Sequence, residues 1–302
     1  MTELDKVYLK TAELLLVIFI GYAMKRCGKL TAKDTQTFSR IVLNITLPSV
    51  VIKNLWDISF DQDLLWAIIF GFAANALLLL AAFLLYRRQD QQKWLAALFS
   101  ITTFNIGNFA VPVLSSFISA KAMAGVLAFN LPACIFTYAI VPSCSMLAEQ
   151  GNSWKTSAKK ILHSVPTMTC LLMFLLAAVH LTLPQPVYHI ASSFANANTF
   201  LAMLSVGSLM DFSVPKAFLS ETLPHIGTRF VLAGVLAASV FMLPIGADLR
   251  SALIISLFVP AASSCPVFAM QAGYRGGAVS VANSVYLLIS VFMLALLSVL
   301  LY

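Results

Sequence analysis

Residues 102–114 read TTFNIGNFAVPVL, and they lie inside a long apolar segment bounded by Lys93 and Lys121. Asparagine, glycine and proline are poor helix formers, and a proline inside a helix removes a backbone hydrogen bond. A second stretch, VPAASSCP at 259–266, places two prolines in another apolar segment. Backbone groups freed in hydrocarbon are costly, so they persist only inside protein or beside a water-filled cavity. We therefore expect two interrupted helices whose free backbone groups form a binding site.

The composition predicts a membrane protein. The 302-residue chain is 60% hydrophobic and 10% charged, with a mean hydropathy of +0.90, whereas soluble domains carry about 25% charged residues. The net charge of +7 comes from short loops and not from a basic stripe interleaved with aromatic residues, which argues against nucleic acid. The five cysteines form no C-x-x-C pair and the histidines have no metal-ligand spacing, so we predict neither a metal site nor a cofactor.

Ten apolar segments come close to the length of about 20 residues that a helix needs to cross a bilayer. They are 8–25, 35–56, 62–86, 93–118, 122–147, 160–181, 187–210, 224–243, 250–273 and 277–301. The longest connection, AEQGNSWKTSAKK, divides the chain almost in half. We predict a first five-helix repeat at 1–147, an inside linker at 148–159 and a second five-helix repeat at 160–302.

The distribution of loop charge predicts the orientation. With the N-terminus outside, twelve basic residues fall on the inside: Lys25, Arg26, Lys29, Lys33, Arg87, Arg88, Lys93, Lys155, Lys159, Lys160, Lys216 and Arg275. Only Lys6, Lys10, Lys53, Lys121 and Arg250 fall outside, beside the acidic residues Asp57, Asp61 and Asp63. We predict a multi-pass protein of the inner (cytoplasmic) membrane with both termini on the periplasmic or exterior side.

The two halves of the chain match at an offset of 154 residues. LWDISF at 55–60 falls on LMDFSV at 209–214, and Pro112 falls on Pro266. Because five helices are an odd number, the second half must enter the membrane from the opposite side, as in many secondary transporters. We predict ten transmembrane helices in two inverted five-helix repeats, with discontinuous helices 4 and 9 crossing each other.

Where broken helices meet, half-helix N-termini suit an anion and half-helix C-termini suit a cation. The residues that we predict to bind substrate around the two breaks are Asn105, Gly107, Asn108, Pro112, Ser263, Ser264 and Pro266. Asn44, Asn130 and Asn283 lie in other helices and extend this set. The alternative is a pair of ordinary proline kinks with asparagines that hydrogen-bond between helices.

Three motifs carry a resemblance to a known family. IVLNITLPSVVI at 41–52, N-x-G-x-x-x-x-P at 105–112 and VPAASSCPVFAMQAGY at 259–274 resemble the auxin efflux carrier family, in order and in spacing. The resemblance implies ten helices in two inverted repeats, a scaffold domain, a transport domain and elevator-type alternating access. The central connection is short, so the chain is similar to the compact bacterial permeases, some of which are associated with malonate and related carboxylates.

We predict a secondary transporter for a small organic anion, and not an enzyme. The chain has no G-x-x-x-x-G-K-[ST] motif for ATP hydrolysis and no G-x-S-x-G nucleophile elbow. A proton or sodium ion could be the coupling ion, and a carrier of the bile-acid or sodium–proton antiporter type is the alternative. The remaining predicted partners are membrane lipid and a second copy of the chain in a homodimer.

Two charged residues fall inside predicted helices, and each has two interpretations. Arg229 is a functional candidate because an intramembrane arginine is costly, but we favour a side chain that extends to the membrane surface. Glu13 is either a proton site or a carboxylate that reaches the surface, and the second interpretation is favoured.

Overall fold

The computed structural model describes residues 3–115, 118–146, 164–210 and 216–301. These residues form helices and no strand, which confirms the all-α prediction for the described part of the chain. Three π-helical turns, labelled η, interrupt the α-helices. In chain order, the first five predicted segments hold α1 (Glu3–Arg26), α2 (Ala32–Ile41), η1 (Val42–Thr46), α3 (Leu47–Leu55), α4 (Gln62–Tyr86), α5 (Gln91–Ile101), η2 (Ile106–Ala110), α6 (Val111–Leu114), α7 (Ala120–Ile135), η3 (Phe136–Ile140) and α8 (Val141–Met146).

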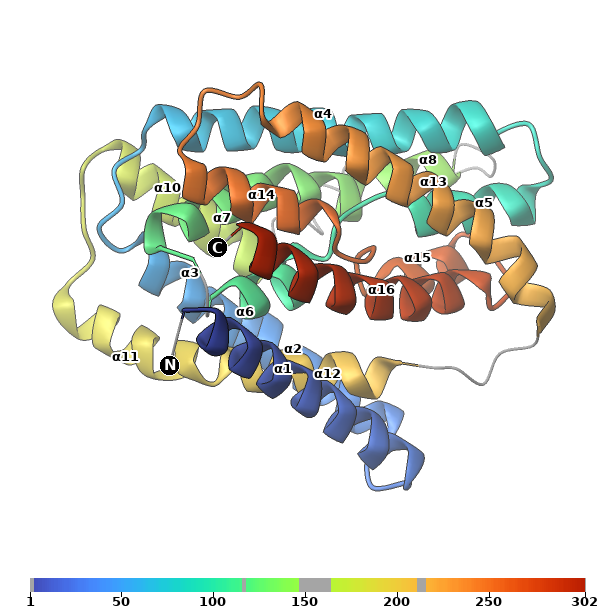
Figure 1. The fold of residues 1–302 in the computed structure, drawn as a ribbon, viewed down its shortest axis with the longest axis horizontal. Helices are drawn as coiled ribbons and strands as arrows, with labels where there is room; N and C mark the ends of the chain where they lie inside the picture. Colours follow the sequence, from blue (N-terminus) through green and yellow to red (C-terminus); the bar gives the residue numbers. More distant parts are fainter. Residues whose placement is uncertain (1–2, 116–117, 147–163, 211–215, 302) are drawn as a thin grey trace.

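The second half of the chain is also helical, and helices of both halves run mostly along the long axis of the molecule (Figure 1). The elements are α10 (Val165–Ala178), α11 (Gln185–Asn196), α12 (Asn198–Leu209), α13 (Lys216–Val240), α14 (Ala247–Leu257), α15 (Cys265–Gln271) and α16 (Ala278–Leu301). The predicted linker at 148–159 and the acidic residue Asp211 lie outside the described residues.

Polar residues at the ends of the apolar segments begin the helices. Asp61 accepts a hydrogen bond from the Leu64 N–H over 3.1 Å and caps α4, and Asp90 caps α5 through the Lys93 N–H over 3.1 Å. Thr31 and Asp34 form a reciprocal capping box at the start of α2. These caps satisfy backbone donors that have no partner within the helix.

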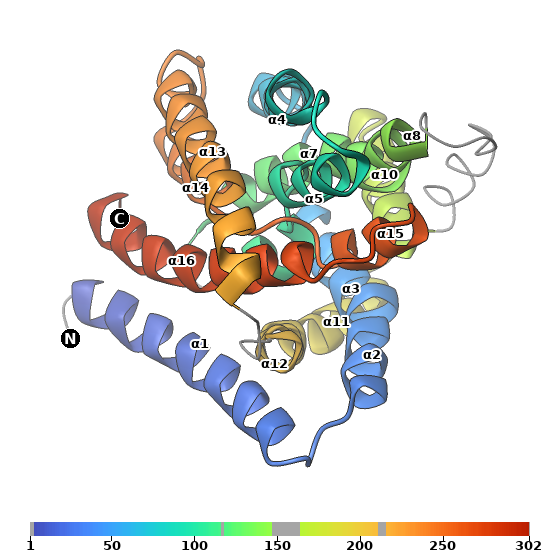
Figure 2. The same ribbon diagram turned by 90° about the vertical axis from the view of Figure 1, so that its right-hand side faces the viewer.

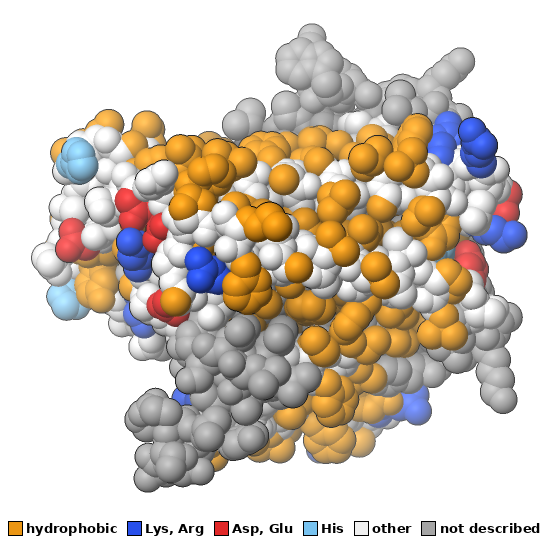
Figure 3. All heavy atoms as spheres, turned by 45° about the horizontal axis from the view of Figure 1, so that its top comes forward, with side chains coloured by type: hydrophobic (Ala, Val, Ile, Leu, Met, Phe, Trp, Pro, Cys, Tyr) orange, Lys and Arg blue, Asp and Glu red, His pale blue; other side chains and the backbone are white. Residues whose placement is uncertain are grey.

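Several of these helices can cross a membrane. Within the described ranges, three are long and apolar enough by themselves: Gln62–Tyr86, Ala120–Ser145 and Ser220–Val240. The pair Gln91–Ile101 and Ile106–Leu114 forms a fourth candidate, with a bend of 43° at its break. Apolar side chains cover the middle of the face shown in Figure 3, and charged side chains gather at its two ends. This pattern fits an apolar layer between two aqueous phases.

The helices pack in two groups. In the first, which we call the α1–α12 group, α1 and α2 pack against α12, η1 joins α2 to α3, and α3 packs against α10 and α11. In the second, the α4–α14 group, α4 and α14 pack against α7, and α13 packs against α16 and α5. Figure 2 shows α1, α2, α11 and α12 on one side of the molecule, with α4, α13 and α14 on the other.

One predicted helix is divided in the structure. The segment 187–210 is predicted as a single helix, but α11 ends at Asn196 and α12 begins at Asn198. The buried Thr46 hydroxyl donates a hydrogen bond to the Asn198 side-chain oxygen over 2.8 Å. Thr46 closes the π-helical turn η1, so the irregular parts of segments 35–56 and 187–210 are in direct contact.

Candidate functional site

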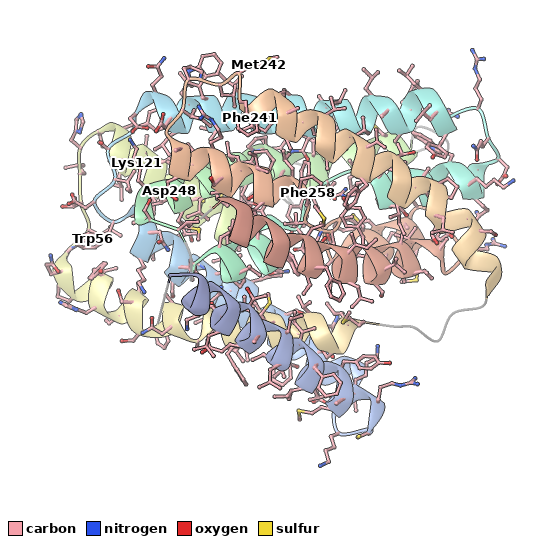
Figure 4. The ribbon with its side chains drawn as sticks, viewed as in Figure 1. Trp56, Lys121, Phe241, Met242, Asp248 and Phe258 are labelled. Carbon is pink, nitrogen blue, oxygen red and sulfur yellow. The ribbon has the colours of Figure 1, made fainter. Side chains whose placement is uncertain are left out.

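The candidate site lies where two helices are interrupted. α5 ends at Ile101 and η2 begins at Ile106, while α14 ends at Leu257 and α15 begins at Cys265. Phe258, the first residue after α14, lies near the middle of the molecule, whereas Lys121 and Asp248 lie toward one end (Figure 4). Both predicted interruptions are therefore present, and the one after α14 lies far from the ends of the bundle.

Asn105 joins the two interruptions. Its backbone N–H donates to the Pro260 carbonyl over 2.9 Å, and its side-chain Nδ2 donates to the Ser263 hydroxyl over 2.8 Å. The Asn105 side chain is only 5% exposed. A backbone stretch without helical hydrogen bonds needs such partners in an apolar environment.

Thr103 adds a second connection. Its hydroxyl oxygen accepts a hydrogen bond from the Ala262 N–H over 3.2 Å and lies 3.4 Å from the Cys265 sulfur. The backbone of Thr103 has a φ of 67°, in the left-handed region that a β-branched residue rarely adopts. Contacts with the other interruption hold this strained conformation, and strain of this kind clusters at functional sites.

The two aligned prolines lie after the irregular backbone and not within it. Pro112 lies in the first turn of α6, and Pro266 lies in the first turn of α15. At Pro266 the missing N–H would have no helical partner, because α15 begins at Cys265. Pro112 instead follows the π-helical turn η2, which already begins this half-helix at Ile106. The prediction that these prolines lie within the breaks is wrong, because the irregular backbone precedes each of them.

Arg229 does not extend to the surface, so that interpretation was wrong. Its side chain is 1% exposed, and its guanidinium donates to the carbonyls of Ile101, Thr102 and Val259. These carbonyls follow or end α5 and α14, so one arginine contacts both interruptions. Glu13 is exposed and forms an ion pair with Lys10 over 2.9 Å.

A cavity of about 570 Å³ opens beside the joined interruptions. Its lining comes from both helix groups: the end of α1, α2 and the end of α12 on one side, and the two interruptions and α7–η3 on the other. Six of the predicted substrate-binding residues line it together: Asn105, Gly107, Asn108, Asn130, Ser263 and Ser264. Because these six residues line one cavity, the cavity is the candidate binding site.

Basic, uncharged polar and apolar residues line the cavity. Lys25 and Lys33 contribute positive charge, and no aspartate or glutamate is among the described residues that line it. The Lys25 ammonium donates to the Met210 carbonyl over 2.8 Å. Near Lys33, hydrogen bonds from Thr31 lower the pKa of Asp34 below its ordinary value.

Two polar atoms in the wall have no partner. The side-chain oxygens of Asn108 and Ser264 are buried without a hydrogen bond to any described residue. Asn105 and Ser264, at the starts of η2 and α15, also make no side-chain capping bond to their helices. Buried polar groups are normally satisfied, so unpaired groups beside a cavity indicate a place for a polar ligand or for water.

The other four predicted residues lie away from this lining. Asn44 is exposed and donates to the Arg40 carbonyl in its own helix over 2.9 Å. Pro112 is buried, and its carbonyl accepts hydrogen bonds from Ser115 and Thr199. Pro266 follows Cys265 in α15, and Asn283 lies in α16 with a buried, unpaired side-chain oxygen. Their roles in substrate binding stay predictions.

Several residues of this site are not among those predicted from the sequence. Lys25 and Lys33 were used only to predict the orientation of the chain. Their place in the cavity was not predicted, because the residues that line it with them come from distant segments. Tyr138, Cys134 and Thr137 line the cavity from α7 and η3, where nothing in an apolar segment distinguishes the inner face. Thr103 lies in TTFN at 102–105, and only the structure identifies it as the residue with the left-handed backbone conformation.

Comparisons with known proteins identify the family. A family model described as membrane transport protein matches residues 6–165, which is more than half of the chain. The chain belongs to this family, the auxin efflux carrier family. An uncharacterized transporter of Methanothermobacter thermautotrophicus is 22% identical to this family member over 265 residues, which cover 85% of the chain and 86% of that protein. The resemblance carried by the three motifs is therefore confirmed at the level of the family, and the protein is a membrane transport protein.

Proposed function

We propose that this protein is a secondary transporter that moves a small organic anion, a carboxylate, across the cytoplasmic membrane by elevator-type alternating access. The observation that carries the proposal is the cavity at the joined interruptions, which contains two lysines and several amide and hydroxyl groups. Its volume of about 570 Å³ falls within the range of small-molecule sites.

The lining favours an anion over a cation. Lys25 and Lys33 attract negative charge, and the described lining offers no carboxylate to a cationic substrate. Asn105 and Asn108 provide amide groups, and η2 begins beside them, where the first helical N–H groups point toward the helix N-terminus. A carboxylate needs several such donors to replace its water, and its apolar remainder fits against Leu43, Leu47 and Val267.

Helix boundaries support the proposed inverted repeat. α4 and α13 are both 25 residues long, and α13 begins and ends 154 positions after α4. α6 begins at Val111 and α15 at Cys265, again 154 positions apart. This is the offset at which the sequence halves match. We infer ten membrane-spanning segments in two inverted five-helix repeats, 1–147 and 160–302, whose fourth and ninth segments are discontinuous and cross.

The two packing groups support the proposed elevator motion. The cavity lies at their boundary, with α2 and η1 of the α1–α12 group facing the interruptions of the α4–α14 group. In an elevator carrier one group stays fixed in the membrane while the other carries the substrate site across it. We assign the α1–α12 group as the scaffold and the α4–α14 group as the moving part.

The orientation follows from the basic loops. α1 begins and α16 ends toward the same end of the molecule (Figure 1), and we place that end outside the cell. The cavity then faces the cytoplasm, because Lys25 and Lys33 flank the inside loop between α1 and α2.

Uptake into proteoliposomes tests the proposed function. Purified protein should accelerate the uptake of at least one member of a panel of mono- and dicarboxylates, with and without imposed proton and sodium gradients. The combined variant Asn105→Ala, Pro266→Ala should abolish this uptake, whereas Asn54→Ala, whose amide donates to the Val50 carbonyl in its own helix, should retain it. No uptake of any carboxylate above empty liposomes would contradict the proposal.

A further inference from the structure

Arg229 links the ends of two half-helices. Its guanidinium donates to the Ile101 carbonyl, to the Thr102 carbonyl over 3.2 Å and to the Val259 carbonyl over 3.0 Å. Ile101 is the last residue of α5, and Val259 follows α14 by two positions.

These carbonyls form a natural cation site. The last carbonyls of a helix have no helical partner, and the helix dipole adds a partial negative charge there. Half-helix C-termini and unwound carbonyls hold the coupling cation in carriers built on broken helices. Here the positive group is the guanidinium of Arg229, which is covalently attached to α13. The guanidinium is planar and carries several N–H donors, and two of its nitrogens donate to these three carbonyls.

The surroundings of Arg229 suit a permanent cation. The centre of the guanidinium lies 5.1 Å from the Phe104 ring and 5.0 Å from the Tyr286 ring, distances at which aromatic faces attract a positive charge. Among the described residues no carboxylate forms an ion pair with it. Phe104 also lines the cavity, so the guanidinium lies behind the wall of the candidate anion site.

We propose that Arg229 is a positioning residue that replaces a coupling metal ion: its tethered guanidinium neutralises the two half-helix C-termini, and transport needs no sodium ion there. This inference rests on the proposed function for its consequence in transport. The charge stays with the moving group in every state of the cycle, so the interruptions remain joined whether the site faces inside or outside. An intramembrane arginine is costly, and this role accounts for its presence.

Chemical rescue with guanidinium tests the proposal. Arg229→Ala should unfold at a lower temperature than the wild type, and guanidinium chloride at about 10 mM should raise its melting temperature by mass action. Urea at the same concentration has nearly the same shape without the charge and should have no such effect. The control is Arg250→Ala, which loses bonds to the Leu243 and Ile245 carbonyls away from the interruptions. Neither it nor the wild type should gain stability from guanidinium.

Two further variants keep the test decisive if Arg229→Ala does not fold. Arg229→Met keeps much of the side-chain volume without the charge, and it should lower carboxylate uptake at least about tenfold because three carbonyls lose their donors. Arg229→Lys keeps the charge and should transport better than Arg229→Met. Wild-type uptake should be equal in sodium and in choline buffers.

The outcomes that would overturn the proposal are equal effects of guanidinium and urea on Arg229→Ala, wild-type behaviour of Arg229→Met, or wild-type uptake that requires sodium. The thermal measurement needs no transported substrate. Two results together would contradict the proposed function and leave the assignment of Arg229 intact. The wild type would transport no carboxylate, and guanidinium would stabilise Arg229→Ala but not the wild type.

Discussion

The side-chain amide of Asn105 donates a hydrogen bond of 2.8 Å to the hydroxyl of Ser263, although the two residues are 158 positions apart in the chain. Both line the cavity, and each lies in one of the two interruptions. The bond therefore connects the halves of the site directly, beside the backbone bond from Asn105 to Pro260. Changes at either residue should affect the other.

A double-mutant cycle measures this connection. Asn105→Ala and Ser263→Ala should each lower kcat/KM for the transported anion about fivefold, which corresponds to a hydrogen bond of about 1 kcal/mol. The double variant should lose less than the product of the two effects, because the second change removes a bond that is already broken. Initial uptake rates and melting temperatures of the four proteins give the result. Independent, multiplicative losses would show that the pair does not act as a unit.

The lysines at the cavity should act through their charge. Lys33→Gln should raise KM for the anion about threefold at low ionic strength, and added salt should reduce the difference from the wild type. Lys25→Gln should have a larger effect, because Lys25 also donates to the Met210 carbonyl. Lys53→Gln is the control, since Lys53 is exposed in α3 and does not line the cavity. Salt-independent effects of Lys33→Gln would contradict an electrostatic role.

The proposed scaffold depends on glycine at the contact between α1 and α12. A Cβ atom at Gly207 would collide with the Ile18 carbonyl oxygen, and one at Gly21 would collide with the Leu204 carbonyl oxygen. Gly207→Ala should therefore destabilise the protein by about 1–3 kcal/mol through overpacking. Gly234→Ala in α13, where an added Cβ meets nothing within 4 Å, should be nearly neutral. Thermal unfolding in detergent compares the two variants.

Cross-linking tests the proposed motion between the two groups. The Ser115 hydroxyl lies 3.3 Å from the Thr199 hydroxyl, which places the end of α6 against the start of α12. In a background without the native cysteines, a disulfide between Ser115→Cys and Thr199→Cys should stop transport, and reduction should restore it. A disulfide between Thr46→Cys and Asn198→Cys, both in the α1–α12 group, should not stop it. Full transport by the first cross-linked protein would exclude sliding at this contact.

The sequence predicted the helical segments and both interruptions because apolar length and poor helix formers are local signals. Pro112 and Pro266 mark the interruptions but lie after the irregular backbone, Pro266 in the first turn of α15 and Pro112 beyond the π-helical turn η2. The break at Ala197 was not predicted, because no proline or glycine marks it. The hydrogen bond between Thr46 and Asn198 beside this break depends on packing between distant segments.

The site was less predictable than the fold. Six of the ten predicted residues converge on one cavity, because the two interruptions and α7 meet there. Arg229 was misjudged because Pro224 marks an apparent helix start, whereas α13 begins at Lys216 and places Arg229 deeper. Lys25 and Lys33 enter the site through the path of α1 and α2, which hydropathy does not reveal.

Protection of an engineered thiol at the site tests the central claim most directly. In a cysteine-free background, Ser263→Cys should react with a small membrane-impermeant thiol reagent applied from the cytoplasmic side, because Ser263 lines the cavity. The carboxylate that the protein transports should slow this reaction in a saturable manner, with a half-maximal concentration close to KM. A thiol that reacts at the same rate with and without saturating carboxylate, in protein that still transports it, would contradict a binding site at the joined interruptions.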